Sequence, residues 1–127
     1  MSEAQPQLSI ELTGSQLAIC LMACVWVSDC PFGKAIKPAD LESAEVEAIW
    51  NKLSEIIVQL RETGFAEPMV EYALLIPVPL SPRELELTIR SIEAVLAECE
   101  GDPLELSLRC GEVDQVVATL QFLKRCR

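Results

Sequence analysis

The stretch Thr13-Gly14-Ser15-Gln16-Leu17 returns 68 positions later as Ser81-Pro82-Arg83-Glu84-Leu85. Both stretches have the Ser/Thr-x-x-Glu/Gln pattern of a capping box, in which the first and fourth residues satisfy each other's backbone N–H groups at the start of a helix. Each follows a short apolar segment that ends in leucine, at Leu12 and at Leu80. The sequence therefore predicts two versions of one unit, in which a short extended segment leads into a helix.

The correspondence between the two halves continues through Gly33 and Gly101, and it then resumes one register shorter. A chain of 127 residues, half of them hydrophobic, is long enough to bury a core of its own without a metal or disulfide staple. We therefore expect a single domain over 1–127, with internal pseudo-repeats at about 8–64 and 74–127.

The first unit should contain a strand and two helices. Residues 8–12 alternate apolar and polar side chains, as a half-buried strand does. Thr13 then caps a helix to about Ser28 or Asp29. A second helix, with apolar residues at three- and four-residue spacings, should run from Ala44 until Gly64 ends it.

The second unit should repeat this order after an extended segment at 72–78, with a helix over 82–99. Residues 104–109 alternate and predict a strand, and a last helix should follow over 113–125. The predicted fold class is α+β and predominantly α, built from two strand–helix–turn–helix pseudo-repeats with four main helices and a small β component. The alternative is an all-α arrangement of four helices.

The net charge of −10 is spread evenly over the two halves. Such a surface repels nucleic acids and anionic membranes, so we expect neither as a partner. An acidic decoy that occupies the basic groove of a nucleic-acid-binding protein remains an alternative. The N-terminus has no signal-peptide pattern, and the apolar run Leu17–Val27 is too short to span a bilayer, which predicts a cytoplasmic protein.

The chain contains no histidine, which excludes catalysis by Ser-His-Asp or Cys-His groups. It has no phosphate-binding or dinucleotide-binding glycine motif. The sequence thus nominates no catalytic residue, cofactor site or metal site, and a non-enzymatic role is expected.

Six cysteines invite a second interpretation, a thiol-based metal or redox protein that uses Cys20, Cys24 and Cys30. Cys20 and Cys24 are four residues apart and flanked by apolar residues, which is also typical of free thiols that pack as small hydrophobes. We prefer the packing interpretation.

The two copies differ most along their first helices. The third predicted helix has polar outward positions, namely Glu86, Thr88, Arg90, Ser91 and Glu93. The first helix has apolar residues at the corresponding places, and a helix that is apolar all round must be covered on all sides. It is either central in the fold or covered by another subunit, and both remain open. The candidate interface residues are Met22, Val25, Trp26, Ala18 and Asp29.

The sequence therefore predicts a small acidic interaction or regulatory module. The apolar first helix would mediate homodimerisation or bind a protein partner, because Trp and Met are enriched in interface cores.

Overall fold

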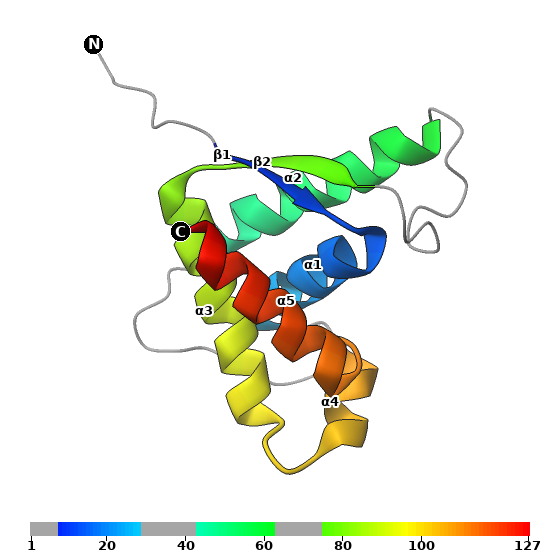
Figure 1. Cartoon of the computed structure of the whole chain (residues 1–127), viewed down its shortest axis with the longest axis vertical. Helices are drawn as coiled ribbons and strands as arrows, with labels where there is room; N and C mark the ends of the chain where they lie inside the picture. The colour runs from blue at the N-terminus through cyan, green and yellow to red at the C-terminus, as the bar shows by residue number, and fades with distance from the viewer. Residues whose placement is uncertain (1–7, 29–42, 63–74) are drawn as a thin grey trace.

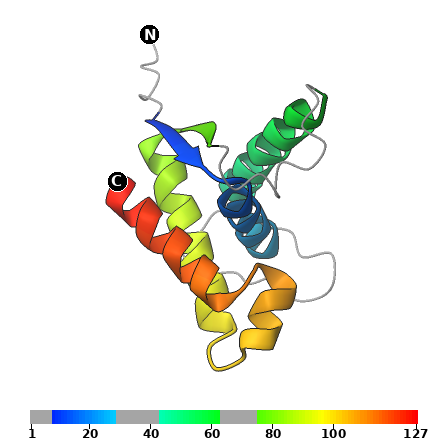
Figure 2. The same ribbon diagram turned by 45° about the vertical axis from the view of Figure 1, so that its right-hand side comes forward.

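The computed structural model describes residues 8–28, 43–62 and 75–127. These residues form two strands and five helices in the order β1 (Leu8–Leu12), α1 (Gly14–Ser28), α2 (Ser43–Glu62), β2 (Ile76–Leu80), α3 (Pro82–Glu98), α4 (Pro103–Arg109) and α5 (Val113–Cys126). The small sheet lies at one end of the molecule and α4 at the opposite end (Figures 1 and 2). The predicted α+β, predominantly helical class is confirmed.

Both capping boxes form as the sequence predicts. The Thr13 N–H donates to Gln16 Oε1 at 2.9 Å, and the Gln16 N–H donates to Thr13 Oγ1 at 3.2 Å. The Ser81 N–H donates to Glu84 Oε1 at 2.8 Å, and the Glu84 N–H donates to Ser81 Oγ at 3.1 Å. Pro82 follows in the first turn, where its missing N–H removes no helical bond. These boxes fix where α1 and α3 begin.

The two strands pair antiparallel, with the partners Leu8–Leu80, Ser9–Pro79, Ile10–Val78, Glu11–Pro77 and Leu12–Ile76. Ile10 lies opposite Val78, which is its own counterpart at the 68-residue spacing. If the two units were related by a twofold axis through the sheet, the residue nearest the axis would have to lie opposite its own counterpart, as Ile10 does. The pseudo-repeat itself stays a prediction.

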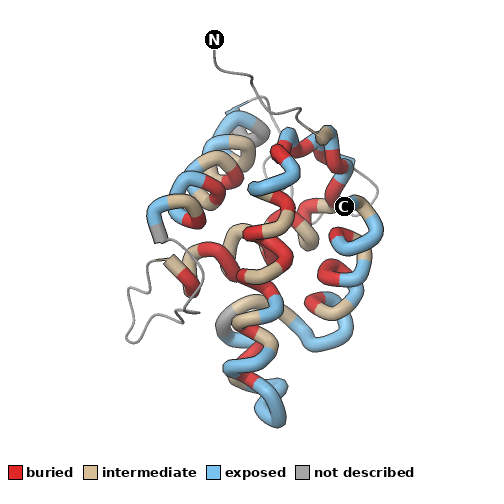
Figure 3. The backbone as a smooth tube through the Cα atoms, turned by 90° about the vertical axis from the view of Figure 1, so that its left-hand side faces the viewer, coloured by how far each residue is buried: buried red, intermediate tan, exposed pale blue. Residues whose placement is uncertain are grey.

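Helix α1 lies in the middle of the described fold. It contacts β1, α2, α3, α4 and α5, and none of its residues is exposed. Buried residues line the inner sides of the surrounding helices, while their exposed residues face outward (Figure 3). This central position gives α1 a structural reason to be apolar on every side.

The predicted strand over 104–109 is wrong, because these residues form α4. The Asp102 side chain accepts a bond from the Glu105 N–H at 3.1 Å, and Pro103 occupies the first turn. These helix-start features outweigh the alternating pattern, and the sheet has no third strand in the part of the chain that the structure describes.

The polar face predicted for α3 is only partly correct. Glu93 is exposed, but Thr88 and Ser91 are fully buried. Their hydroxyl groups donate to the carbonyl groups of Glu84 and Leu87, both at 2.8 Å. Because each hydroxyl is satisfied within its own helix, these small side chains can face the core.

Some sequence predictions fall outside the described residues, including the turn after α1, Gly64 and the start of the 72–78 segment. Within the described ranges, no helix is both long enough and apolar enough to cross a membrane.

A candidate binding groove beside strand β1

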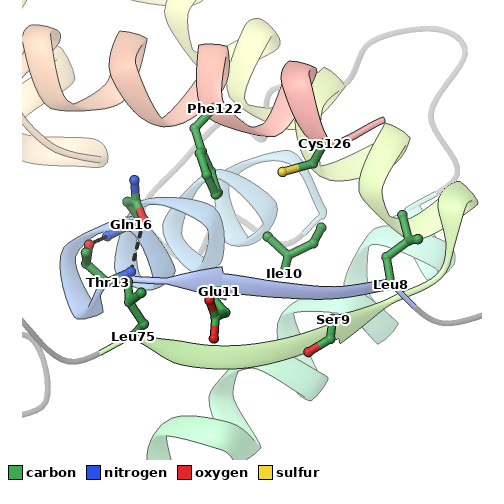
Figure 4. Close-up of a pocket in the computed structure, with 9 residues that line it drawn as sticks. All are labelled: Leu8, Ser9, Ile10, Glu11, Thr13, Gln16, Leu75, Phe122 and Cys126. Carbon is green, nitrogen blue, oxygen red and sulfur yellow. Dashed lines mark hydrogen bonds between the residues drawn. The ribbon is translucent and has the colours of Figure 1, made fainter.

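An open groove of about 650 Å³ runs between the outer edge of β1 and α5 (Figure 4). Its lining is mostly apolar and consists of Leu8, Ser9, Ile10, Glu11, Thr13, Gln16, Leu75, Phe122 and Cys126. Leu8 and Ile10 extend from the strand toward α5, and Phe122 and Cys126 extend from the helix toward the strand. Phe122 and Cys126 are four residues apart, so they share one face of α5.

The prolines of β2 determine which backbone groups of β1 face this groove. Pro77 and Pro79 have no N–H to donate, so the ladder between the strands must use the intervening residues of β2. In an antiparallel pair, the backbone groups of successive residues point alternately toward and away from the partner strand. Ser9 and Glu11, which lie opposite the prolines, therefore point their N–H and C=O groups away from β2 and along the groove.

These outward groups have no partner in the described chain. No backbone hydrogen bond outside the helices and the two-stranded ladder involves Ser9 or Glu11. The next residue that could continue the edge is Thr13, whose N–H already donates to Gln16. Within the described residues, the edge of β1 thus presents two N–H donors and two C=O acceptors without partners.

A second groove, of about 580 Å³, lies between β2 and α2. Its lining includes four polar or charged side chains, Asn51, Lys52, Glu55 and Gln59. Lys52 Nζ donates to the Pro79 carbonyl at 3.0 Å and lies 2.7 Å from Glu84 Oε1. Because prolines remove the donors and a lysine occupies an acceptor, this edge of the sheet is closed to strand pairing.

The residues that the sequence nominated for an interface lie on α1. Ala18, Met22, Val25 and Trp26 are all partly buried, and Trp26 packs against the core. Asp29 lies outside the described residues. The structure thus brings the apolar residues into one helix at the centre of the fold and leaves only part of their surface accessible.

Cys20, Cys24 and Cys110 form a group of interacting thiols around α1. Burial raises the pKa of Cys24 to about 12, although the hydroxyl groups of Ser91 and Thr88 beside it act in the opposite direction. Burial also raises the pKa of Cys110 to about 12, and its Sγ donates to the Ile19 carbonyl at 3.4 Å.

Cys20 is affected in the same way. Burial raises its pKa well above the ordinary value, and the neighbouring Cys24 and Cys110 raise it further. A reactive or metal-binding thiol needs the thiolate, so these three are held in the unreactive form. No group of potential ligands suited to a metal ion occurs among the described residues, and Cys30 lies outside them.

The most exposed large apolar side chains are on α4, where Leu104 is 71% and Leu108 is 74% exposed. Leu106, between them in sequence, is buried, so the helix has an inner and an outer apolar side. This outer pair was missed because a strand would have put all three leucines on one buried face.

Comparisons with protein-family models, curated proteins and solved structures gave no match to this chain.

The groove beside β1 was not predicted from the sequence. The signal in the sequence was the spacing of Pro77 and Pro79. Two prolines at alternate positions indicate a strand that cannot donate hydrogen bonds along one edge. Any edge that can still pair must then belong to the partner strand.

Proposed function

We propose that the protein is a non-enzymatic cytoplasmic interaction module that binds a protein partner in the groove between β1 and α5. The observation that carries this proposal is the combination of a strand edge with which no described residue pairs and the apolar side chains Phe122 and Cys126. Exposed strand edges readily pair with other chains, and natural proteins usually cover or disable them. Pro77, Pro79 and Lys52 disable the edge of β2, whereas none of the described residues covers the edge of β1.

Two further features agree with this role. The whole chain lacks the histidine on which most general-base chemistry depends, and the perturbed thiols are shifted away from reactivity. The groove has the apolar wall that gives affinity and the backbone groups that give orientation, which together are typical of peptide-binding surfaces.

The proposal is tested by substituting a groove residue that packs on the margin of the core, and each variant is first shown to be folded by circular dichroism. Phe122→Glu places a charge on the partly buried wall of the groove, and Val58→Ser is a matched control at an exposed position of α2. Each protein is immobilised and used to capture partners from an extract of the source cells, with detection by mass spectrometry. We expect a protein that is captured by the wild type and the Val58→Ser control and lost with Phe122→Glu. The same captured set with all three proteins would contradict the groove as the binding site.

A homodimer formed through α1 is a second proposal. It is supported by the part of the Met22, Val25 and Trp26 surface that the described residues leave uncovered. Val25→Arg should then give a folded monomer, while the wild type has the mass of a dimer in size-exclusion chromatography with light scattering. A monomeric wild type would rule this proposal out.

The acidic-decoy alternative makes a different prediction. Attraction between the net charge of −10 and a basic partner weakens as salt is added, because exposed charges are screened beyond about 10 Å at 0.1 M salt. Capture that is equal at low and high salt would therefore argue against a decoy and leave the groove proposal intact.

A further inference from the structure

We infer that the β1–α5 groove takes an extended segment of a partner protein in which apolar residues alternate with Lys or Arg, and that this segment adds to the sheet as a third, antiparallel strand beside β1. This inference rests on the proposed function and specifies the chemistry and the binding mode of the partner.

The backbone of β1 supplies the orientation. Ser9 and Glu11 each point one N–H and one C=O into the groove. An added antiparallel strand would use these four groups through the two residues that lie opposite Ser9 and Glu11. Thr13 ends the edge because its N–H is bonded to Gln16, so the paired region is short.

The side chains of the groove specify the alternation in the segment. Ser9 and Glu11 are on the exposed face of the sheet, whereas Ile10 and Leu12 are on the buried face. Residues directly opposite each other in a sheet point to the same side, so the residues paired with Ser9 and Glu11 would be exposed. The alternate residues would point inward, onto Phe122 and Cys126 of α5, and should be apolar.

The charge of the groove favours a cationic segment. Glu11 is the one charged residue among the described residues that line it, and the whole chain has a net charge of −10. A Lys or Arg opposite Glu11 gains a cross-strand ion pair, whereas a second copy of this acidic chain would bring further negative charge. A basic partner segment therefore fits better than self-association through β1.

The other edge of the sheet supplies an internal control. At the 68-residue spacing, Ser9 corresponds to Pro77 and Glu11 to Pro79. The fold accommodates proline at these places in β2, because the ladder does not use their N–H groups. The double substitution Ser9→Pro and Glu11→Pro should therefore close the β1 edge in the way that β2 is closed, while the pairing of the two strands is kept.

The experiment uses a synthetic decapeptide of alternating Lys and Val with blocked ends, and measures its affinity for the full chain by calorimetry or fluorescence anisotropy. Two methylated versions give the test of strand addition. In the first, the backbone nitrogens of the Lys residues are methylated, which removes the N–H groups that would face β1. In the second, the Val nitrogens are methylated, and these would face away from it. An alternating Glu–Val peptide is the charge control.

We expect saturable binding of the Lys–Val peptide. Methylation at Lys should weaken it by about tenfold or more, because hydrogen bonds to β1 are lost, and methylation at Val should leave it nearly unchanged. The Glu–Val peptide should bind more weakly, and Glu11→Gln should cost about two- to fivefold in affinity for the Lys–Val peptide. The Ser9→Pro, Glu11→Pro protein should be folded by circular dichroism and should not bind.

Absence of saturable binding by the Lys–Val peptide would overturn the inference. Equal affinity of the two methylated peptides would also overturn it, because attraction to an acidic surface alone would then account for binding. This comparison uses the wild-type protein only, so it does not depend on whether a variant folds. If a captured partner depends on Phe122 but the Lys–Val peptide does not compete with it, the inference about the segment fails and the proposed groove function stands. If capture does not depend on Phe122, the proposed function fails as well.

Discussion

Alkaline pH should destabilise this protein through its buried thiols. The ordinary pKa of a cysteine is 9.0, and burial raises those of Cys24 and Cys110 to about 12 and that of Cys20 well above 9.0. Between pH 9 and 12 the unfolded chain therefore releases thiol protons that the folded chain retains. The stabilisation from keeping these thiols neutral is fully present below pH 9 and is lost as the pH rises toward 12.

The size of the effect follows from counting protons. Each thiol that ionises only in the unfolded state lowers the free energy of unfolding by about 1.4 kcal/mol per pH unit. Three such thiols give a loss of about 4 kcal/mol between pH 8 and pH 10, because ionisation in the unfolded state is nearly complete at the upper limit. A small domain is stable by only about 5–15 kcal/mol, so this loss should be readily measurable.

The assay is urea unfolding followed by far-ultraviolet circular dichroism at pH 7, 8, 9 and 10, in the presence of a reductant. The control is the triple variant Cys20→Ala, Cys24→Ala, Cys110→Ala. It should be less stable at pH 7, because small cavities replace the sulfur atoms, but its stability should change much less with pH. Other titrating groups are present in both proteins and cancel in the comparison. A pH dependence that is the same in the wild type and the triple variant would refute the reasoning.

Four smaller predictions test the local structure by urea or thermal unfolding. Ser81→Ala removes one half of the capping box and should cost about 1 kcal/mol; no change would mean that the box does not hold the start of α3. Leu12→Ala, at a fully buried strand position, should cost about 2–5 kcal/mol and lower Tm, and a smaller loss would mean that the core collapses into the space. Gly101→Ala should cost about 1–2 kcal/mol because the backbone φ is 80° there, although no atom lies within 4 Å of the added carbon. Leu108→Ser should change stability by less than about 0.5 kcal/mol, since the side chain is 74% exposed, and a large loss would show that Leu108 is covered.

Local signals in the sequence predicted the starts of the long helices because the relevant groups are close along the chain. The boxes at Thr13 and Ser81 need only a hydroxyl and an acceptor three residues later, and both form as expected. The segment at 104–109 failed for the opposite reason. Its alternating leucines favour a strand, but a strand needs a partner, and a partner is not a local property of the sequence.

The candidate site was harder to predict because it depends on the arrangement of distant elements. Glu11 and Phe122 are far apart in sequence, and only the packing of α5 beside β1 brings them to one groove. The same limit affected the polar face of α3. Thr88 and Ser91 look suited to water, but each satisfies its hydroxyl within the helix and faces the buried side. The difference between the first and third helices is therefore smaller than the sequence suggested.

The stronger difference between the two halves lies in their strands. β1 and β2 begin the two predicted pseudo-repeats, pair with each other, and each lie beside a groove. At the 68-residue spacing, β1 has Ser9 and Glu11 where β2 has Pro77 and Pro79. These two differences distinguish an edge that can add a strand from one that cannot. If the only requirement were to avoid aggregation, proline in both strands would meet it, because the ladder between them uses neither position. The N–H donors lie on one edge alone, beside a groove whose far wall is formed by Phe122 and Cys126, and this combination favours a specific partner for β1 over accidental exposure.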